Sequence, residues 1–150
     1  RYPGFRVLSM KIFRSLFLCL LAALVSNAHA ELVLVANPHS GIERLTQDEV
    51  INIYLGRYRR LASGVVAEPI DQPVNVEART RFYRRLVNKS LAEINAYWAR
   101  LVFSGKTRPP QVVESVDSML RLVATQPGAL AYVERAQADA RVKIVFELGD

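Results

Sequence analysis

The stretch Glu31-Leu32-Val33-Leu34-Val35-Ala36-Asn37-Pro38-His39-Ser40-Gly41 decides the fold class. Residues 31–36 form a short apolar run with β-branched valines, which is typical of a buried strand. Residues 37–41 are a cluster of turn formers, so the strand runs directly into a loop. A buried strand followed by a polar loop is typical of the first strand of a sheet that is covered by helices.

Strands and helices alternate in the sequence that follows. Thr46 and Glu49, and likewise Ser90 and Glu93, have the spacing of a capping box, which predicts helices from about 47 to 55 and from about 91 to 102. A further helix is expected to begin near Asn75. The other expected elements are strands over 65–70, 129–133 and 142–146, a short helix or turn over 134–140, and an amphipathic helix that carries Val112, Val116, Met119, Leu120 and Val123. This alternation predicts the α/β class, with a small mixed sheet flanked by helices in a single domain, 31–150.

The segment before Glu31 is typical of a cleavable secretory signal peptide. Met10-Lys11-Ile12-Phe13-Arg14 carries two positive charges and leads into an apolar run over 16–25. Ala28-His29-Ala30 then supplies the small residues at which a signal peptidase cleaves. The apolar run has about half the length of a membrane-spanning helix. We therefore expect residues 10–30 to be removed and the mature form not to be embedded in a membrane.

The composition and charge of the mature domain differ from those of the whole chain, because the residues before the cleavage site are excluded. Residues 1–9 are interpreted as an upstream segment that is non-native or disordered. Cys19 leaves with the signal peptide, so the mature chain has neither a disulfide nor a thiolate. Of the net charge of +6, four positive charges belong to Arg1, Arg6, Lys11 and Arg14, which leaves +2. A nearly neutral domain gives no electrostatic reason to expect nucleic acid as a partner.

The mature residues do not combine into a catalytic or metal site. His39 is the only histidine after the cleavage site, and no Asp, Glu or Cys stands beside it at a metal-ligand spacing. The sequence contains neither a Gly-x-Ser-x-Gly elbow nor a glycine-rich phosphate loop. We therefore expect a binding protein rather than an enzyme, with no catalytic residue, metal or cofactor.

Two loops are candidates for binding a small anion, because N–H groups and the helix dipole favour anions where strand ends meet helix N-termini. The first loop contains Asn37, Ser40 and Gly41. The second runs from Asp71 to Asn75 and leads into the helix that carries Arg79. Each has a structural alternative: Ser40-Gly41 as a simple turn, Asn75 as a helix N-cap, and Arg79 as the ion-pair partner of Glu77 or Asp71.

The order of short motifs along the chain is more informative than any one of them. The motifs are Asn37-Pro38, Ser40-Gly41, Ile53-Tyr54-Leu55-Gly56-Arg57, Ile70-Asp71-Gln72, Arg81-Phe82-Tyr83, Tyr97-Trp98, Phe103-Ser104-Gly105, Pro109-Pro110 and Pro127-Gly128-Ala129-Leu130-Ala131-Tyr132-Val133. This succession resembles the phosphate ABC transporter substrate-binding proteins, and more closely their short, stand-alone relatives. The resemblance implies a single lobe of the type-II periplasmic-binding-protein fold, a location in the periplasm, phosphate or another oxyanion as ligand, and an ABC-type permease as partner.

The chain departs from that family in two respects. A full receptor closes two lobes on its ligand, whereas the mature chain is long enough for one. The resemblance further implies an Arg and a Ser-Gly-Thr segment at a helix N-terminus, and the matching stretch 71–76 contains neither. An alternative function is therefore a lobe that has lost solute capture and docks on a periplasmic sensor or membrane complex, through a basic, aromatic surface of Tyr58, Arg59, Arg60 and Arg84.

Overall fold

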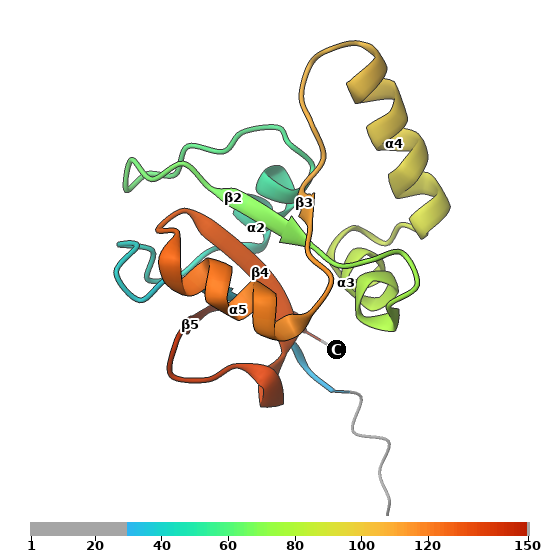
Figure 1. Ribbon diagram of the computed structural model, residues 1–150. Coiled ribbons are helices and arrows are strands. Elements are labelled where there is room, and N and C mark those ends of the chain that lie inside the picture. Colours follow the sequence, from blue (N-terminus) through green and yellow to red (C-terminus); the bar gives the residue numbers. More distant parts are fainter. Residues whose placement is uncertain (1–29, 150) are drawn as a thin grey trace, which may run out of the picture.

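The computed structural model describes residues 30–149 (Figure 1). The expected upstream segment 1–9 lies outside these residues, as does the expected signal peptide 10–30 except for Ala30. The elements are β1 (Leu32–Ala36), α2 (Gln47–Tyr54), β2 (Glu68–Asp71), α3 (Glu77–Val87), α4 (Leu91–Phe103), β3 (Gln111–Val112), α5 (Val116–Thr125), β4 (Ala129–Glu134), the 3₁₀ turn η1 (Arg135–Gln137) and β5 (Lys143–Glu147). Within the described range, no helix combines the length and the apolar character that crossing a membrane requires.

The strands form one five-stranded mixed sheet in the order β3-β2-β4-β1-β5. Strand β2 runs parallel to β3 and β4, whereas β1 runs antiparallel to β4 and β5. In the centre of the sheet, Val33 pairs with Val133, and Ile70 pairs with Ala131. Helices cover the sheet on both faces, which confirms the predicted α/β class with a small mixed sheet flanked by helices (Figure 1).

The sequence of β1 explains why both faces are covered. Leu32 and Leu34 enter a larger core with apolar residues of α2, α3 and α4, whereas Val33 and Val35 enter a smaller core with α5. Every residue of β1 is buried. A strand whose two faces both lie against helices must be apolar at consecutive positions, because neighbouring side chains point to opposite faces.

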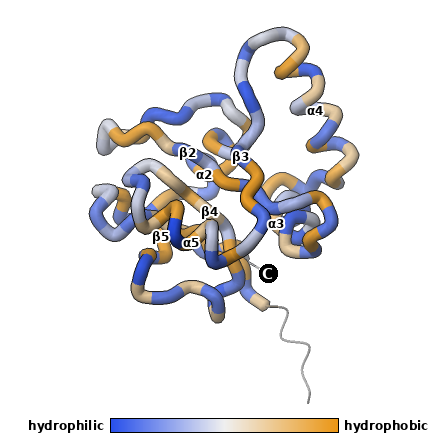
Figure 2. The backbone as a smooth tube through the Cα atoms, in the orientation of Figure 1, coloured by the Kyte–Doolittle hydropathy of each residue, from blue (hydrophilic) through white to orange (hydrophobic). Residues whose placement is uncertain are grey.

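Helix α4 projects from the body of the domain (Figure 1). Its predicted capping box is present: the Ser90 Oγ accepts from the Glu93 N–H, and a Glu93 carboxylate oxygen accepts from the Ser90 N–H. The hydrogen bond from the Ser90 N–H, and to a smaller extent the one from the Lys89 side chain, lower the pKa of Glu93 to about 2. The helix buries Ile94 and Trp98, and hydrophilic and hydrophobic residues alternate along it (Figure 2).

Several predicted boundaries differ from the structure. Including Val112 in the amphipathic helix is wrong: Ser115 caps α5, and Val112 pairs with Asp71 in β3 instead. The second strand begins at Glu68 rather than 65, because Val66 forms an isolated bridge with Arg60. The short helix or turn expected over 134–140 is the 3₁₀ turn η1.

Gly128 lies where another segment of backbone passes very close to it. A Cβ at this position would lie 2.1 Å from the carbonyl oxygen of Val66, and the Gly128 carbonyl accepts a hydrogen bond from the Glu68 N–H at 2.7 Å. We expect Gly128→Ala to lower the free energy of unfolding by about 2 kcal/mol, because one of the two backbones must move away from the start of β2. Urea denaturation measures this loss. Gly149→Ala, whose Cβ meets nothing within 4 Å, is the control, and an equal loss in both variants would contradict the prediction.

Candidate anion-binding site

The carboxylate of Asp71 is the centre of a buried polar cluster at the carboxyl end of β2. The Nε of Arg79 donates to Oδ2 at 3.0 Å, and the Tyr83 hydroxyl donates to the same oxygen at 2.9 Å. The Tyr132 hydroxyl and the Gln72 backbone N–H donate to Oδ1, the latter at 2.8 Å. Asp71 is 3% exposed and Arg79 is 6% exposed. The cluster is therefore a buried ion pair in which both carboxylate oxygens have two donors.

Three elements bring these side chains together. Asp71 ends β2, Tyr132 lies on the neighbouring strand β4, and Arg79 and Tyr83 are four residues apart on α3, which places them on one face of that helix. The guanidinium carbon of Arg79 lies 5.3 Å from the centre of the Tyr83 ring. Burial, and then the charge of Asp71, raise the pKa of Tyr83 and Tyr132 well above the ordinary value. Both phenols therefore stay protonated and act as donors.

The N-terminus of α3 has no side-chain cap. Its N-cap residue is Val76, whereas Thr46, Ser90 and Ser115 cap α2, α4 and α5 through their hydroxyl groups. Asn75, the alternative N-cap indicated by the sequence, precedes this position and is exposed. The first-turn N–H groups of α3 therefore lack a side-chain acceptor.

Arg79, in the same first turn, is only partly satisfied by Asp71. Its Nη1 is buried and has no hydrogen-bond partner among the described residues. Of the two ion-pair partners considered for Arg79 from the sequence, the structure places Asp71 against it. A small acceptor close to Nη1 would complete the hydrogen bonding of a buried guanidinium.

The polar groups of the first loop are engaged within the chain. The Asn37 Nδ2 donates to the carbonyl oxygen of Ala124 at 2.9 Å, and its Oδ1 accepts from the His39 N–H at 2.8 Å. The Ser40 Oγ accepts from the Ile42 N–H at 3.2 Å. Gly41 is exposed and has a φ of +74°, a conformation that favours glycine in a turn. Together these contacts fix the loop to α5 and shape its turn.

The two candidate loops lie at opposite edges of the sheet. Ala36, the last residue of β1, pairs with Leu130 near the start of β4, and Leu130 pairs with Pro69 near the start of β2. The first loop therefore leaves the edge at which β2 begins, whereas Asp71 stands at the edge where β2 ends. Asp71 and Arg79 are in contact, and Asn75 lies in the turn that joins their elements. Asn37, Ser40 and Gly41 cannot share an anion with them.

Three polar partners of Asp71 were not identified from the sequence: Gln72, Tyr83 and Tyr132. Tyr132 carries a signal that points to this role, because a tyrosine in an otherwise apolar, buried strand needs a partner for its hydroxyl. Tyr83 follows Arg79 by four residues, which places both on the side of α3 that faces β2. For Gln72 no signal is present in the sequence.

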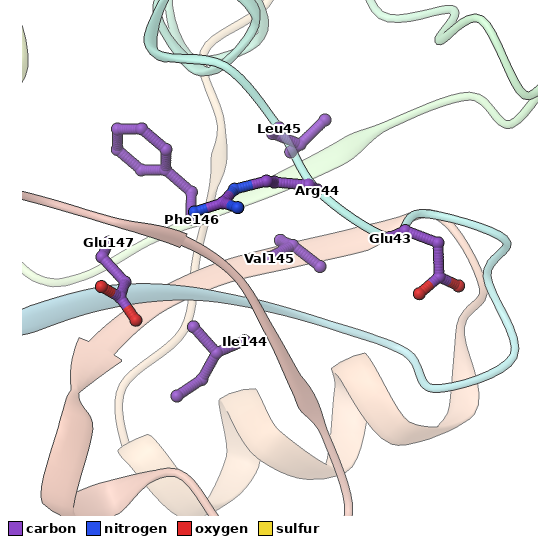
Figure 3. A pocket seen from close by; sticks show the side chains of 7 residues that line it. All are labelled: Glu43, Arg44, Leu45, Ile144, Val145, Phe146 and Glu147. Atoms are coloured by element: carbon purple, nitrogen blue, oxygen red, sulfur yellow. The ribbon is translucent and has the colours of Figure 1, made fainter.

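A hollow of about 420 Å³ lies beside β5, away from this cluster (Figure 3). Ile144 and Val145 lie between Glu43 and Glu147 in that view, and Arg44 also lines the hollow. Glu43 pairs with Lys143 at 3.0 Å, and Glu147 pairs with Arg135 at 2.6 Å. Two carboxylates at the hollow make it a poor site for an anion.

A small mixed sheet between two layers of helices, with a polar cluster at a strand end, resembles one lobe of the periplasmic-binding-protein class. Among solved structures, the chain is similar to an ABC-type phosphate transport receptor from Vibrio cholerae, with 18% identity and a TM-score of 0.61 over 77% of this chain and 45% of that one. It is also similar to a putative phosphate ABC transporter substrate-binding protein with bound phosphate from Clostridium perfringens, with 15% identity and a TM-score of 0.61 over 77% and 44% of the two chains. PstS from Borrelia burgdorferi gives 14% identity and a TM-score of 0.59 over 77% and 46%.

These similarities show the fold. The matched region spans less than half of each of the three structures. The sequence matches no protein-family model and no curated protein.

Proposed function

We propose that this chain is a periplasmic lobe that recognises phosphate or a related oxyanion, as the solute-binding component of an ABC-type uptake system. The observation that carries the proposal is the uncapped N-terminus of α3 together with the buried, unpartnered Nη1 of Arg79. Helix N-terminal N–H groups and a guanidinium are the donors that bind oxyanions in proteins. The likeness to phosphate receptors supports the same ligand class.

Binding at this site is expected to be weak. The Nε of Arg79 already donates to Asp71, so one edge of the guanidinium is occupied and a negative charge lies close to the site. A single lobe also leaves the anion open to water, which weakens each charge-assisted hydrogen bond. We therefore expect dissociation constants in the millimolar range rather than the micromolar range.

Isothermal titration of the purified protein with phosphate and with sulfate tests the proposal. Asn75→Asp places a negative charge directly before α3, where it favours the helix but repels an anion, so binding is expected to weaken without loss of stability. Asn95→Asp is the control, because Asn95 is exposed on α4 and the change in net charge is the same. No heat with either anion at millimolar concentration would refute the receptor function and leave the fold unaffected.

A second function is favoured by the four donors that converge on Asp71. The Asp71 carboxylate accepts hydrogen bonds from an arginine, two phenols and a backbone N–H. It thus occupies the strand-end position at which open α/β sheets usually bind their ligands. On this alternative, the lobe has lost solute capture and docks on a periplasmic sensor or membrane protein. Co-purification with a defined periplasmic partner in the absence of anion binding would favour it over the first proposal.

A further inference from the structure

A groove of about 570 Å³ lies between α2, α4 and the C-terminal end of α3 with the residues just after it. It shares no lining residue with the Asp71 cluster. Ile51, Leu55, Val87 and Tyr97 give it an apolar floor, and each of these side chains belongs to or packs against the larger core. The Tyr97 hydroxyl donates to the carbonyl oxygen of Leu55 at 2.6 Å, so α4 is held against the end of α2. The groove is therefore built into the fold rather than formed by a loose loop.

The charges along this groove are mainly positive. Lys89 pairs with Glu93 at 3.1 Å, so these two residues offset each other. Within residues 30–149, the Arg57 guanidinium donates only to the neutral amide oxygen of Asn52, at 3.3 Å. Arg100 has no ion pair or side-chain hydrogen bond to any of residues 30–149. Two guanidinium groups without a carboxylate partner thus line an apolar surface, which suits an occupant with both apolar and acidic groups.

The same surface extends beyond the groove along α4. Ala96 and Arg100 line the groove, and Phe103 follows Arg100 by three residues, at a spacing that keeps it on the same side of the helix. Phe103 is 95% exposed, although burying a phenylalanine is strongly favourable. From Glu93 to Phe103 the surface runs for about 15 Å, at about 1.5 Å per helical residue. An occupant that covers all of it is longer than a small ligand.

We propose that this groove binds an amphipathic, acidic helical segment of a partner protein. Two helices that leave an apolar channel between them offer the grooves into which the side-chain ridges of a third helix pack. Apolar residues of that segment at i, i+3, i+4 and i+7 would contact Leu55, Tyr97 and Phe103, and flanking carboxylates would pair with Arg57 and Arg100. The proposal does not depend on oxyanion binding at α3, because the two sites have no residue in common.

A designed peptide with Leu at i, i+3, i+4 and i+7 and Glu at the other positions is the probe, and its Lys counterpart is the comparison. We expect the Glu peptide to bind, and Arg100→Glu to weaken that binding by about tenfold or more. Arg44→Glu is the matched control, because Arg44 is an exposed arginine outside the groove and the charge change is identical. Phe103→Ala should also weaken binding, since it removes the anchor at the end of α4.

The outcomes separate the proposal from its competitors. Equal binding of the Glu and Lys peptides, or equal weakening by Arg100→Glu and Arg44→Glu, would overturn it, because either result means that net charge alone is recognised. Absence of binding by the Glu peptide would also overturn it. Binding of a medium-chain fatty acid in the groove without any binding of the Glu peptide would assign the site to a small amphiphile and reject the helical partner. Chemical-shift changes confined to the groove residues on adding the Glu peptide would support it.

Discussion

Replacing Asp71 by asparagine is expected to lower the free energy of unfolding by about 3–5 kcal/mol. Asp71 is the only carboxylate among residues 30–149 that pairs with Arg79, so the substitution leaves a buried guanidinium charge without that partner. It also turns one acceptor oxygen into an NH₂ donor that faces the donors of Arg79, Tyr83 and Tyr132. Domains of this size have a total stability of about 5–15 kcal/mol, so the variant should be close to unfolding.

Urea denaturation of Asp71→Asn measures this loss of unfolding free energy, with Asp117→Asn as the control. Asp117 pairs with Arg121 and Arg141 on the surface of α5, and its side chain is 57% exposed, so its loss is expected to cost less than about 1 kcal/mol. The double variant Asp71→Leu with Arg79→Met removes both charges and should recover part of the loss. Equal stability of Asp71→Asn and Asp117→Asn would contradict a buried ion pair at the end of β2.

Replacing Phe82 by alanine is expected to cost about 3–5 kcal/mol of unfolding free energy. Phe82 is fully buried and its ring contacts three other aromatic rings. Its ring stacks on Tyr132 with centroids 3.8 Å apart and meets Tyr54 and Tyr83 edge-on at 4.7 Å and 5.2 Å. Removing it creates a cavity beside the two tyrosines that donate to Asp71, so the polar cluster should loosen as well.

The exposed Phe103 gives a matched control for this second change. Phe103→Ala removes the same side chain from a position that is 95% exposed, and we expect a change below about 0.5 kcal/mol. Thermal unfolding followed by circular dichroism compares the two variants directly. Similar losses of unfolding free energy in both variants would mean that the aromatic cluster around Phe82 does not stabilise the core.

Much of the fold could be predicted from the sequence because its signals are local. The apolar run of β1 and the capping boxes at Thr46 and Ser90 are properties of a few neighbouring residues, and the structure contains each of them. The short strand β3 could not be predicted in this way. Its two exposed residues acquire strand geometry only because they pair with Ile70 and Asp71, far away in the sequence.

The candidate site was harder to predict, because its arrangement depends on strand order. The sequence shows two polar loops after two strands, but only the antiparallel pairing of β1 with β4 places them at opposite edges of the sheet. The ion pair of Asp71 with Arg79 was one of two pairings that the spacing allowed. The phenols that complete the cluster come from residues that the apolar pattern assigns to the core.

A titration of the ¹⁵N-labelled protein with phosphate, followed by two-dimensional NMR, tests the central claim most directly. If the open lobe recognises oxyanions at the start of α3, the backbone amides of Glu77, Ala78 and Arg79 should shift progressively at millimolar phosphate, and those of Asn37 to Gly41 should not. Absence of shifts at α3, or shifts that begin at the first loop, would contradict the account.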